Sequence, residues 1–142
     1  MANDKIHDAV VAALKNDDWH ILHQNFSIRY AEVEIRADVI AEPPPILAEK
    51  DDRQILVEIK TFGGRSFIKE MQHALGQYIY YRNILTFKQE TYEMFMAIDK
   101  SVYEMLFQQQ ATSQIVKINK INLLIVDVPR KEVVKWIKHE EQ

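Results

Sequence analysis

The sequence predicts an α/β protein in which helices cover a mixed β-sheet. Apolar residues recur with helical spacing over 5–16 and 67–85, and they alternate with polar residues between 19 and 39. The continuous apolar run at 94–98 and the predominantly apolar run at 121–128 are typical of strands buried on both faces. Because strands and helices alternate in the second half, we expect an α/β sandwich with the order α-β-β-β-α-β-α-β-α.

Length and composition restrict the classes of protein that fit. The chain has 142 residues, a length typical of one domain, here 1–142. It contains no cysteine, which excludes disulfide bonds and thiolate catalysis. No run approaches the ~20 apolar residues that a bilayer-spanning helix needs. We therefore expect a soluble, cytoplasmic protein with no membrane partner.

Charge is distributed unevenly along the chain. The net charge is −3, which argues against binding nucleic acid by bulk electrostatics. The first 110 residues hold 12 Lys and Arg against 17 Asp and Glu, whereas the remainder holds 6 against 4. Any basic partner surface is therefore expected to be local.

The N-terminal segment predicts an amphipathic helix over 5–16. Asn3 or Asp4 is available as its N-cap, because short polar side chains accept hydrogen bonds from the first turn. His7 and Asp8 lie on the other side of this helix. Its apolar side consists of Ile6, Val10, Ala13 and Leu14.

Two strands are predicted next, over 19–30 and 33–39, with a turn near Ala31–Glu32. Successive strand side chains point to opposite faces, so Asp38 lies on the polar face of the second strand. Pro43–Pro45 then interrupts the pattern, because proline cannot donate to a central ladder.

A further strand over 55–60 completes the predicted first half. Residues 46–48 can resume a strand after the prolines, and Asp51–Asp52 supplies the turn that leads into 55–60. We expect the result to be an antiparallel meander of three strands. Glu58 and Lys60 share one face of the last strand, and a buried strand carries two opposite charges only for a reason.

The segment after this strand predicts the longest helix. Gly63–Gly64 permits positive φ at the exit from the strand, and Ser66 can cap a helix over 67–85. Gln77 and Tyr81 are four residues apart, so they stand one above the other on a single helix face.

The remaining chain is predicted to alternate between strands and helices. Residues 94–98 fit a buried strand and 101–108 a short helix. A polar loop is expected over 109–114, followed by a second buried strand over 121–128. The pattern at 131–139 predicts a closing helix.

The strongest chemical signal is Glu58-x-Lys60, which is the only Asp/Glu-x-Lys in the sequence. Asp38, on the preceding predicted strand, adds a second carboxylate. Two converging carboxylates suit a hard cation such as Mg2+ or Mn2+, and a neighbouring lysine can orient water or stabilise developing phosphate charge. An exposed ion pair at a solvated strand end is the alternative interpretation.

This pattern resembles the PD-(D/E)xK signature of the restriction-endonuclease-like fold. Gln77 through Tyr81 is similar to the Q-x-x-x-Y element of RecB-like nucleases. The whole chain resembles the XisH family, in the segments at His7–Asp8, Asp18–Trp19, Leu47–Lys50, Val57–Lys60, Ala74–Arg82 and Val133–Ile137. Two features depart from the nuclease pattern: Arg36-Ala37 stands where a proline usually precedes the acid, and the prolines at 43–45 separate the two acids.

The resemblance implies a role for each candidate residue and a set of partners. Asp38 and Glu58 would ligate Mg2+ or Mn2+, and Lys60 would act as the base beside them. Supporting or substrate contacts would come from Gln77, Tyr81, His7 and Asp8. Members of the family are cyanobacterial fdxN-element excision controlling factors, which implies DNA and the companion factor XisI as partners and leaves a homo-oligomer open.

Two functions therefore remain open. The first is a Mg-dependent deoxyribonuclease-like site that serves DNA excision. The second is a non-catalytic regulatory module that binds XisI or a recombinase, which the acidic first 110 residues favour because DNA repels negative charge. Candidate DNA contacts, which are residues of a kind that is more often ordinary solvated charge, are Arg65, Lys69, Arg82, Lys117, Lys120, Arg130, Lys131, Lys135 and Lys138.

Other chemistries do not fit the sequence. His20 and His23 are three apart on a predicted strand, so they face opposite sides and cannot chelate one metal there. Gly63–Gly64 lacks the Lys-Ser/Thr of a phosphate-binding loop, and no Gly-x-Ser-x-Gly nucleophile turn occurs.

Overall fold

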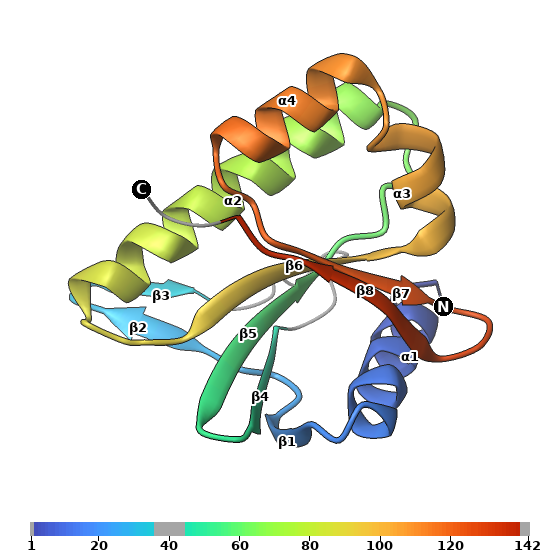
Figure 1. The fold of residues 1–142 in the computed structure, drawn as a ribbon. Coiled ribbons are helices and arrows are strands. Elements are labelled where there is room, and N and C mark those ends of the chain that lie inside the picture. The colour runs from blue at the N-terminus through green and yellow to red at the C-terminus, as the bar shows by residue number, and fades with distance from the viewer. Residues whose placement is uncertain (1, 36–44, 140–142) are drawn as a thin grey trace.

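A computed structural model describes residues 2–35 and 45–139 of the chain. The described residues form four helices and eight strands (Figure 1). In chain order these are α1 (Ala2–Asn16), β1 (His20–His23), β2 (Ile28–Tyr30), β3 (Val33–Ile35), β4 (Ile46–Lys50), β5 (Arg53–Ile59), α2 (Phe67–Phe87), β6 (Glu93–Asp99), α3 (Lys100–Leu106), α4 (Gln110–Ile118), β7 (Leu123–Asp127) and β8 (Glu132–Ile137).

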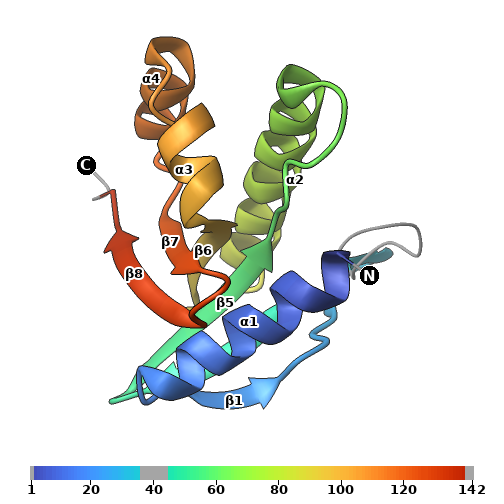
Figure 2. The same ribbon diagram turned by 90° about the vertical axis from the view of Figure 1, so that its right-hand side faces the viewer.

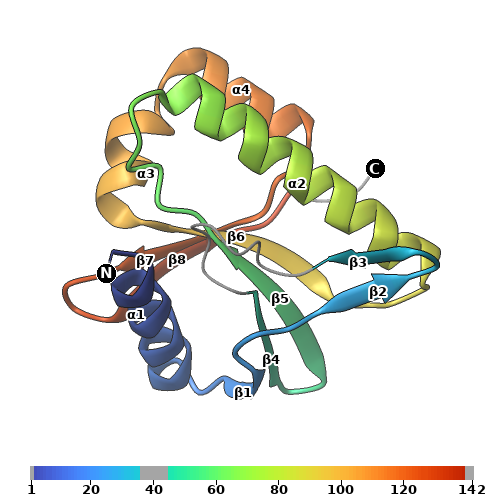
Figure 3. The same cartoon turned by 180° about the vertical axis from the view of Figure 1, so that it is seen from behind.

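Six of the strands form one mixed sheet in the order β1-β4-β5-β6-β7-β8. The central strands β5, β6 and β7 run parallel, whereas β1, β4 and β8 pair antiparallel to their neighbours. The predicted mixed α/β architecture is confirmed. The hairpin of β2 and β3 forms a separate two-stranded sheet beside the C-terminal end of α2 (Figure 3).

Helices cover the large sheet on both faces (Figure 2). The face toward α1 is filled by an apolar cluster that includes Val57 and Phe95. The opposite face lies under α2, α3 and α4, and its cluster includes Leu56 and Tyr78. Because strand side chains alternate, each residue of β5 belongs to one of these two layers. Among the described residues, no helix is both long and apolar enough to cross a bilayer.

The predicted strand over 19–30 is wrong as a single element. The structure divides it into β1, which pairs with β4, and β2, which pairs with β3. Between them the Phe26 backbone N–H donates to the Pro45 carbonyl at 2.9 Å, which turns the chain away from the large sheet. The predicted meander is wrong as well, because β2 and β3 pair in a separate sheet and β1 is the neighbour of β4. The expected return of the chain from 46–48 through Asp51–Asp52 into an antiparallel strand is confirmed. Asp38, in the second predicted strand, lies outside the described residues.

Two predictions in the second half are also wrong, so the predicted element order does not hold there. The polar stretch 109–114 is not a loop, because α4 runs through it, with Thr112 and Val116 buried and the other polar residues facing solvent. Residues 131–139 hold a strand, β8, instead of a helix. A register shift opposite Ile125 and Val126 sets Val133 and Trp136 on the α1 side of the sheet. Val133 and Trp136 are therefore three residues apart on one face of a strand, which is the spacing that predicts a helix in the sequence.

The turns around β5 differ from one another in how well they were predicted. Asp51 and Asp52 form the β4–β5 turn with φ of 49° and 67°, as short polar residues permit. Ser66 caps α2 by accepting a hydrogen bond from the Lys69 backbone N–H, as predicted. Gly63–Gly64 permits positive φ but does not adopt it, and Phe62 has the positive value instead, with φ of 52°.

Candidate active site

Glu58 and Lys60 lie in the layer between the large sheet and α2. They alternate with Val57 and Ile59, which face α1. Glu58 is 4% exposed and Lys60 9% exposed, and the Lys60 backbone N–H donates to the Ala97 carbonyl at 3.0 Å. The alternative of an exposed ion pair is therefore wrong. Burying two ionisable groups is costly unless neighbouring polar groups compensate.

Helix α2 supplies such a neighbour. The Lys60 ammonium donates a hydrogen bond to the side-chain oxygen of Gln77. Tyr81, one turn further along α2, is also buried, at 9% exposed. The structure thus brings together Lys60 at the end of β5 and Gln77 on the helix that follows, two residues singled out from the sequence for different reasons.

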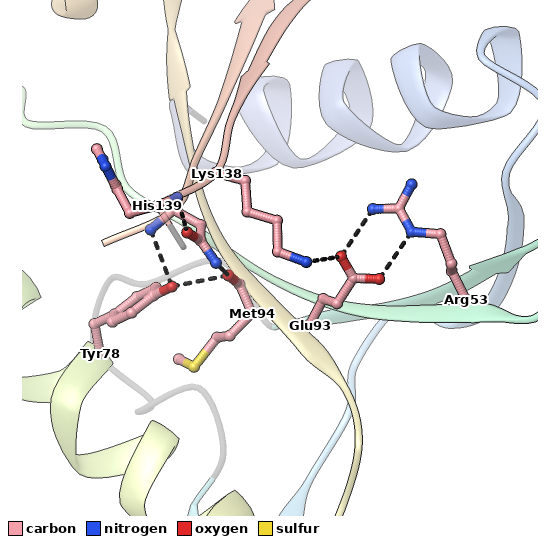
Figure 4. Close-up of polar contacts among 7 residues, drawn as sticks. Arg53, Tyr78, Glu93, Met94, Lys138 and His139 are labelled. Carbon is pink, nitrogen blue, oxygen red and sulfur yellow. Dashed lines mark hydrogen bonds and ion pairs between the residues drawn. The ribbon is translucent and has the colours of Figure 1, made fainter. Parts of the chain in front are cut away.

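Tyr78 is a further member of this layer that the sequence did not single out. Its hydroxyl donates to the Met94 carbonyl at 2.8 Å and accepts from the Asn122 backbone N–H at 3.2 Å (Figure 4). Burial raises the pKa of the Tyr78 hydroxyl to about 12, and the nearby charge of Glu58 contributes in the same direction. The hydroxyl therefore stays protonated at neutral pH, and the Glu58 carboxylate lies close enough for its charge to act on this ring.

The loop after Lys60 is held by two kinds of contact. The Phe62 ring is buried and packs against Phe67 and Phe107, with ring centroids 5.3 and 5.4 Å away. Glu70 accepts a hydrogen bond from the Gly64 backbone N–H at 2.9 Å. A Cβ atom at Gly64 would lie 2.7 Å from that Glu70 oxygen, so the small residue permits the close approach. These contacts fix the direction in which the chain leaves Lys60.

His7 and Asp8 lie in the other layer, because α1 covers the opposite face of the sheet (Figure 2). The His7 ring forms a hydrogen bond with the Gln24 carbonyl at 3.1 Å, and the Asp8 side chain is 79% exposed. The structure therefore does not bring these two predicted supporting residues into the layer that contains Glu58 and Lys60.

Of the two predicted metal ligands, the structure describes Glu58 alone, since Asp38 falls in the undescribed stretch 36–44. Within residues 2–35 and 45–139, no three His, Asp or Glu side chains are grouped so as to hold a metal ion. The donors present beside Lys60 are oxygens, from the Glu58 carboxylate and the Gln77 amide, and oxygen donors suit Mg2+ or Mn2+. The predicted metal site stays a prediction.

Four of the candidate DNA contacts have structural partners. Arg130 pairs with Asp127 at 3.8 Å, and the Lys135 ammonium lies 5.4 Å from the centroid of the Tyr103 ring. The other two form hydrogen bonds. Arg82 donates to the carbonyls of Asn119 and Lys120 at 2.8 and 3.2 Å, which satisfies backbone acceptors at the end of α4. Lys138 donates to Glu93 at 2.9 Å, and Arg53 binds the same carboxylate at 2.8 Å (Figure 4). The Arg53 hydrogen bond lowers the pKa of Glu93 to about 2.

Comparison with known proteins relates this chain to one family and to solved structures. The family model of the XisH protein matches residues 1–134. The crystal structure of an fdxN element excision controlling factor protein from Anabaena variabilis is similar, with a TM-score of 0.86 and 30% identity over 95% of this chain and 99% of that chain. An XisH family protein from Nostoc punctiforme PCC 73102 has a TM-score of 0.85 and 31% identity over 95% of this chain and 100% of that chain. No curated protein matches the chain.

Proposed function

This chain belongs to the XisH family, and on that premise we propose that it takes part in the excision of a DNA element through a divalent-metal phosphodiester site at the end of β5. A similar protein from Anabaena variabilis is described as an excision controlling factor for the fdxN element. The proposal extends that role to this chain and assigns the chemistry to Glu58 and Lys60.

The observation that carries the proposal is the burial of Glu58 and Lys60 together with the contact between Lys60 and Gln77. A strand end that served only the fold would carry apolar residues in this layer, as Leu56 does on the same face. Ionisable groups retained at such a cost cluster at functional sites. Glu58 and Lys60 are largely shielded from bulk water, which strengthens the action of a charge at this position.

Each side chain then has a defined task. Glu58 and Asp38 would hold Mg2+ or Mn2+, which when bound polarises a phosphodiester and activates water. Lys60 places a positive charge where negative charge develops on the phosphate. Gln77 fixes the Lys60 ammonium, and Tyr81 borders the same layer from α2. Tyr78 remains protonated and does not compete for the cation.

Cleavage of duplex and single-stranded DNA with Mg2+ or Mn2+ tests the proposal. We expect Glu58→Gln and Lys60→Met to reduce cleavage about 100-fold or more, because each keeps side-chain volume while removing charge. Matched controls are Glu90→Gln and Lys5→Met, which change exposed residues and should cleave as the wild type does. Circular dichroism must show that all four variants are folded. Wild-type cleavage by a folded Glu58 or Lys60 variant would contradict the proposal.

The second candidate is a non-catalytic regulatory module that binds the companion factor XisI or a recombinase. The excess of acidic residues over the first 110 positions favours it, because DNA phosphates repel such a surface. The same assay separates the two functions when it is repeated with purified XisI. Absence of cleavage by the folded wild type, with and without XisI, together with co-elution of the two proteins, would support the regulatory function.

A further inference from the structure

Helix α4 exposes aliphatic side chains where a surface helix normally presents polar ones. Ile118 is 79% exposed and Ile115 38% exposed, and Ala111 is also exposed. These three residues, here named the α4 stripe, are spaced i, i+4 and i+7 and so lie along one side of the helix. The α4 stripe borders a surface hollow of about 740 Å³. Exposed apolar patches of this kind mark interaction sites.

The C-terminal end of the α4 stripe meets a polar hollow of about 910 Å³ between α2, α4 and the segment after β8. Ile118 lines both hollows. The basic residues lining the second hollow are Arg82, Lys120 and Lys138. Apolar and basic surface are therefore continuous around Ile118.

The charge of this region is predominantly positive. Helix α4 contains no acidic residue and carries Lys117 in its last turn. His139 lines the second hollow, and its pKa is lowered, first by burial and second by the positive charge of Lys117. Lys117 therefore adds positive charge to this region. Two acidic residues, Glu90 and Glu93, also line that hollow. The charge of Glu93 is offset by its ion pairs with Arg53 and Lys138, so the positive charges of the other lining residues exceed the charge of Glu90. The surface that α4 offers to a partner is therefore aliphatic along its length and positively charged at one end.

We propose that the α4 stripe, with Lys117 and Lys120 at its end, is a docking surface for an amphipathic helix of a partner protein that is acidic at one end. Apolar side chains of that helix would cover Ile115 and Ile118, and its carboxylates would lie near the two lysines. DNA fits this surface less well, because aliphatic side chains have neither the positive charge nor the hydrogen-bond donors that bind phosphate groups. The surface lies on different elements from Glu58 and Lys60, so it stands whichever of the two functions holds.

Fluorescence polarisation with the full chain tests this surface. The probe is a labelled helical peptide of about 18 residues with leucines at i, i+4 and i+7 and glutamates at one end. The matched probe has lysines in place of the glutamates. We expect the wild type to bind the acidic probe about tenfold more tightly. The double variant K117E/K120E should reverse that preference, and I115S/I118S should lose both probes.

The control variant is Met105→Ser, which removes an apolar side chain of similar exposure (74%) on α3. It should bind both probes as the wild type does, and circular dichroism should show every variant folded. Equal affinity for the two probes, or unchanged binding by I115S/I118S, would overturn the proposal. Displacement of the acidic probe by duplex DNA at low concentration would assign the surface to nucleic acid instead. A concentration-dependent dimer that I118S abolishes would assign it to a second copy of the chain.

Discussion

The layer beneath α2 and the outer side of α4 depart from the usual distribution of residues in opposite directions. Beneath α2, Glu58 and Lys60 are charged residues in the interior. On α4, Ile118 is an aliphatic residue almost fully in solvent. Either departure lowers stability or solubility relative to the ordinary arrangement. Folding alone explains neither region, so each is a candidate for a separate function.

Removing Tyr78 should have the largest effect on stability, because its ring fills the layer that contains Glu58. We expect Tyr78→Ala to lower the free energy of unfolding by about 3–5 kcal/mol. Tyr78→Phe keeps the ring and loses the hydroxyl bonds to Met94 and Asn122, which should cost about 1–2 kcal/mol. Urea unfolding followed by circular dichroism measures both. A loss of less than 1 kcal/mol in the alanine variant would show that this layer is loosely packed.

The two sides of α4 should respond very differently to the same change. Val116 is buried, so Val116→Ala should cost about 2 kcal/mol through the cavity that it leaves. Ile118→Ala on the exposed side should change the free energy of unfolding by less than about 0.5 kcal/mol. Urea midpoints of the two variants, measured side by side, check this. A cost above 1 kcal/mol at Ile118 would mean that the α4 stripe serves the fold of this chain.

The ion pair at Glu93 should give a smaller effect that depends on pH. Arg53, and then Lys138, lower the pKa of Glu93 from 4.5 to about 2, so the folded state favours the charged form. The stabilisation is present above pH 4.5 and is lost as the pH falls from about 5 to about 2. Because the Arg53 side chain is 50% exposed, we expect only about 1 kcal/mol.

Thermal unfolding of wild type and Glu93→Gln, measured from about pH 6 down to about pH 2, tests the effect. The midpoints of the two proteins should differ at pH 6 and converge near pH 2. A constant difference between the two midpoints at all pH values would show that the carboxylate is not held by these cations.

Local patterns predicted the elements whose signal lies within a few residues. The helix behind Ser66, the buried strands β6 and β7, and the turn at Asp51–Asp52 follow from capping, apolar runs and turn chemistry. Helix α4 was not predicted because residues 109–114 contain one apolar residue, Ala111, and so show no apolar repeat of helical spacing. Strand β8 was not predicted because a register shift gives it helical spacing.

The candidate site shows the same division between local and long-range information. Alternation along β5 was enough to place Glu58 and Lys60 on one face, and helix spacing placed Gln77 and Tyr81 together. Local patterns do not encode how α2 crosses the sheet. The crossing determines how deeply these residues are buried and which groups the Tyr78 hydroxyl contacts. Nor does a local pattern reveal that Phe62 takes the positive φ after Lys60, because its ring is fixed by Phe67 and Phe107.

Calorimetric titration with Mn2+ tests whether Glu58 holds a metal ion, and it does so without requiring a DNA substrate. We expect the wild type to bind Mn2+ at one site, Glu58→Gln to abolish binding, and the exposed control Glu90→Gln to bind as the wild type does. A folded wild type that binds no Mn2+, or a Glu58→Gln variant that binds it equally well, would contradict the assignment of the metal site to Glu58.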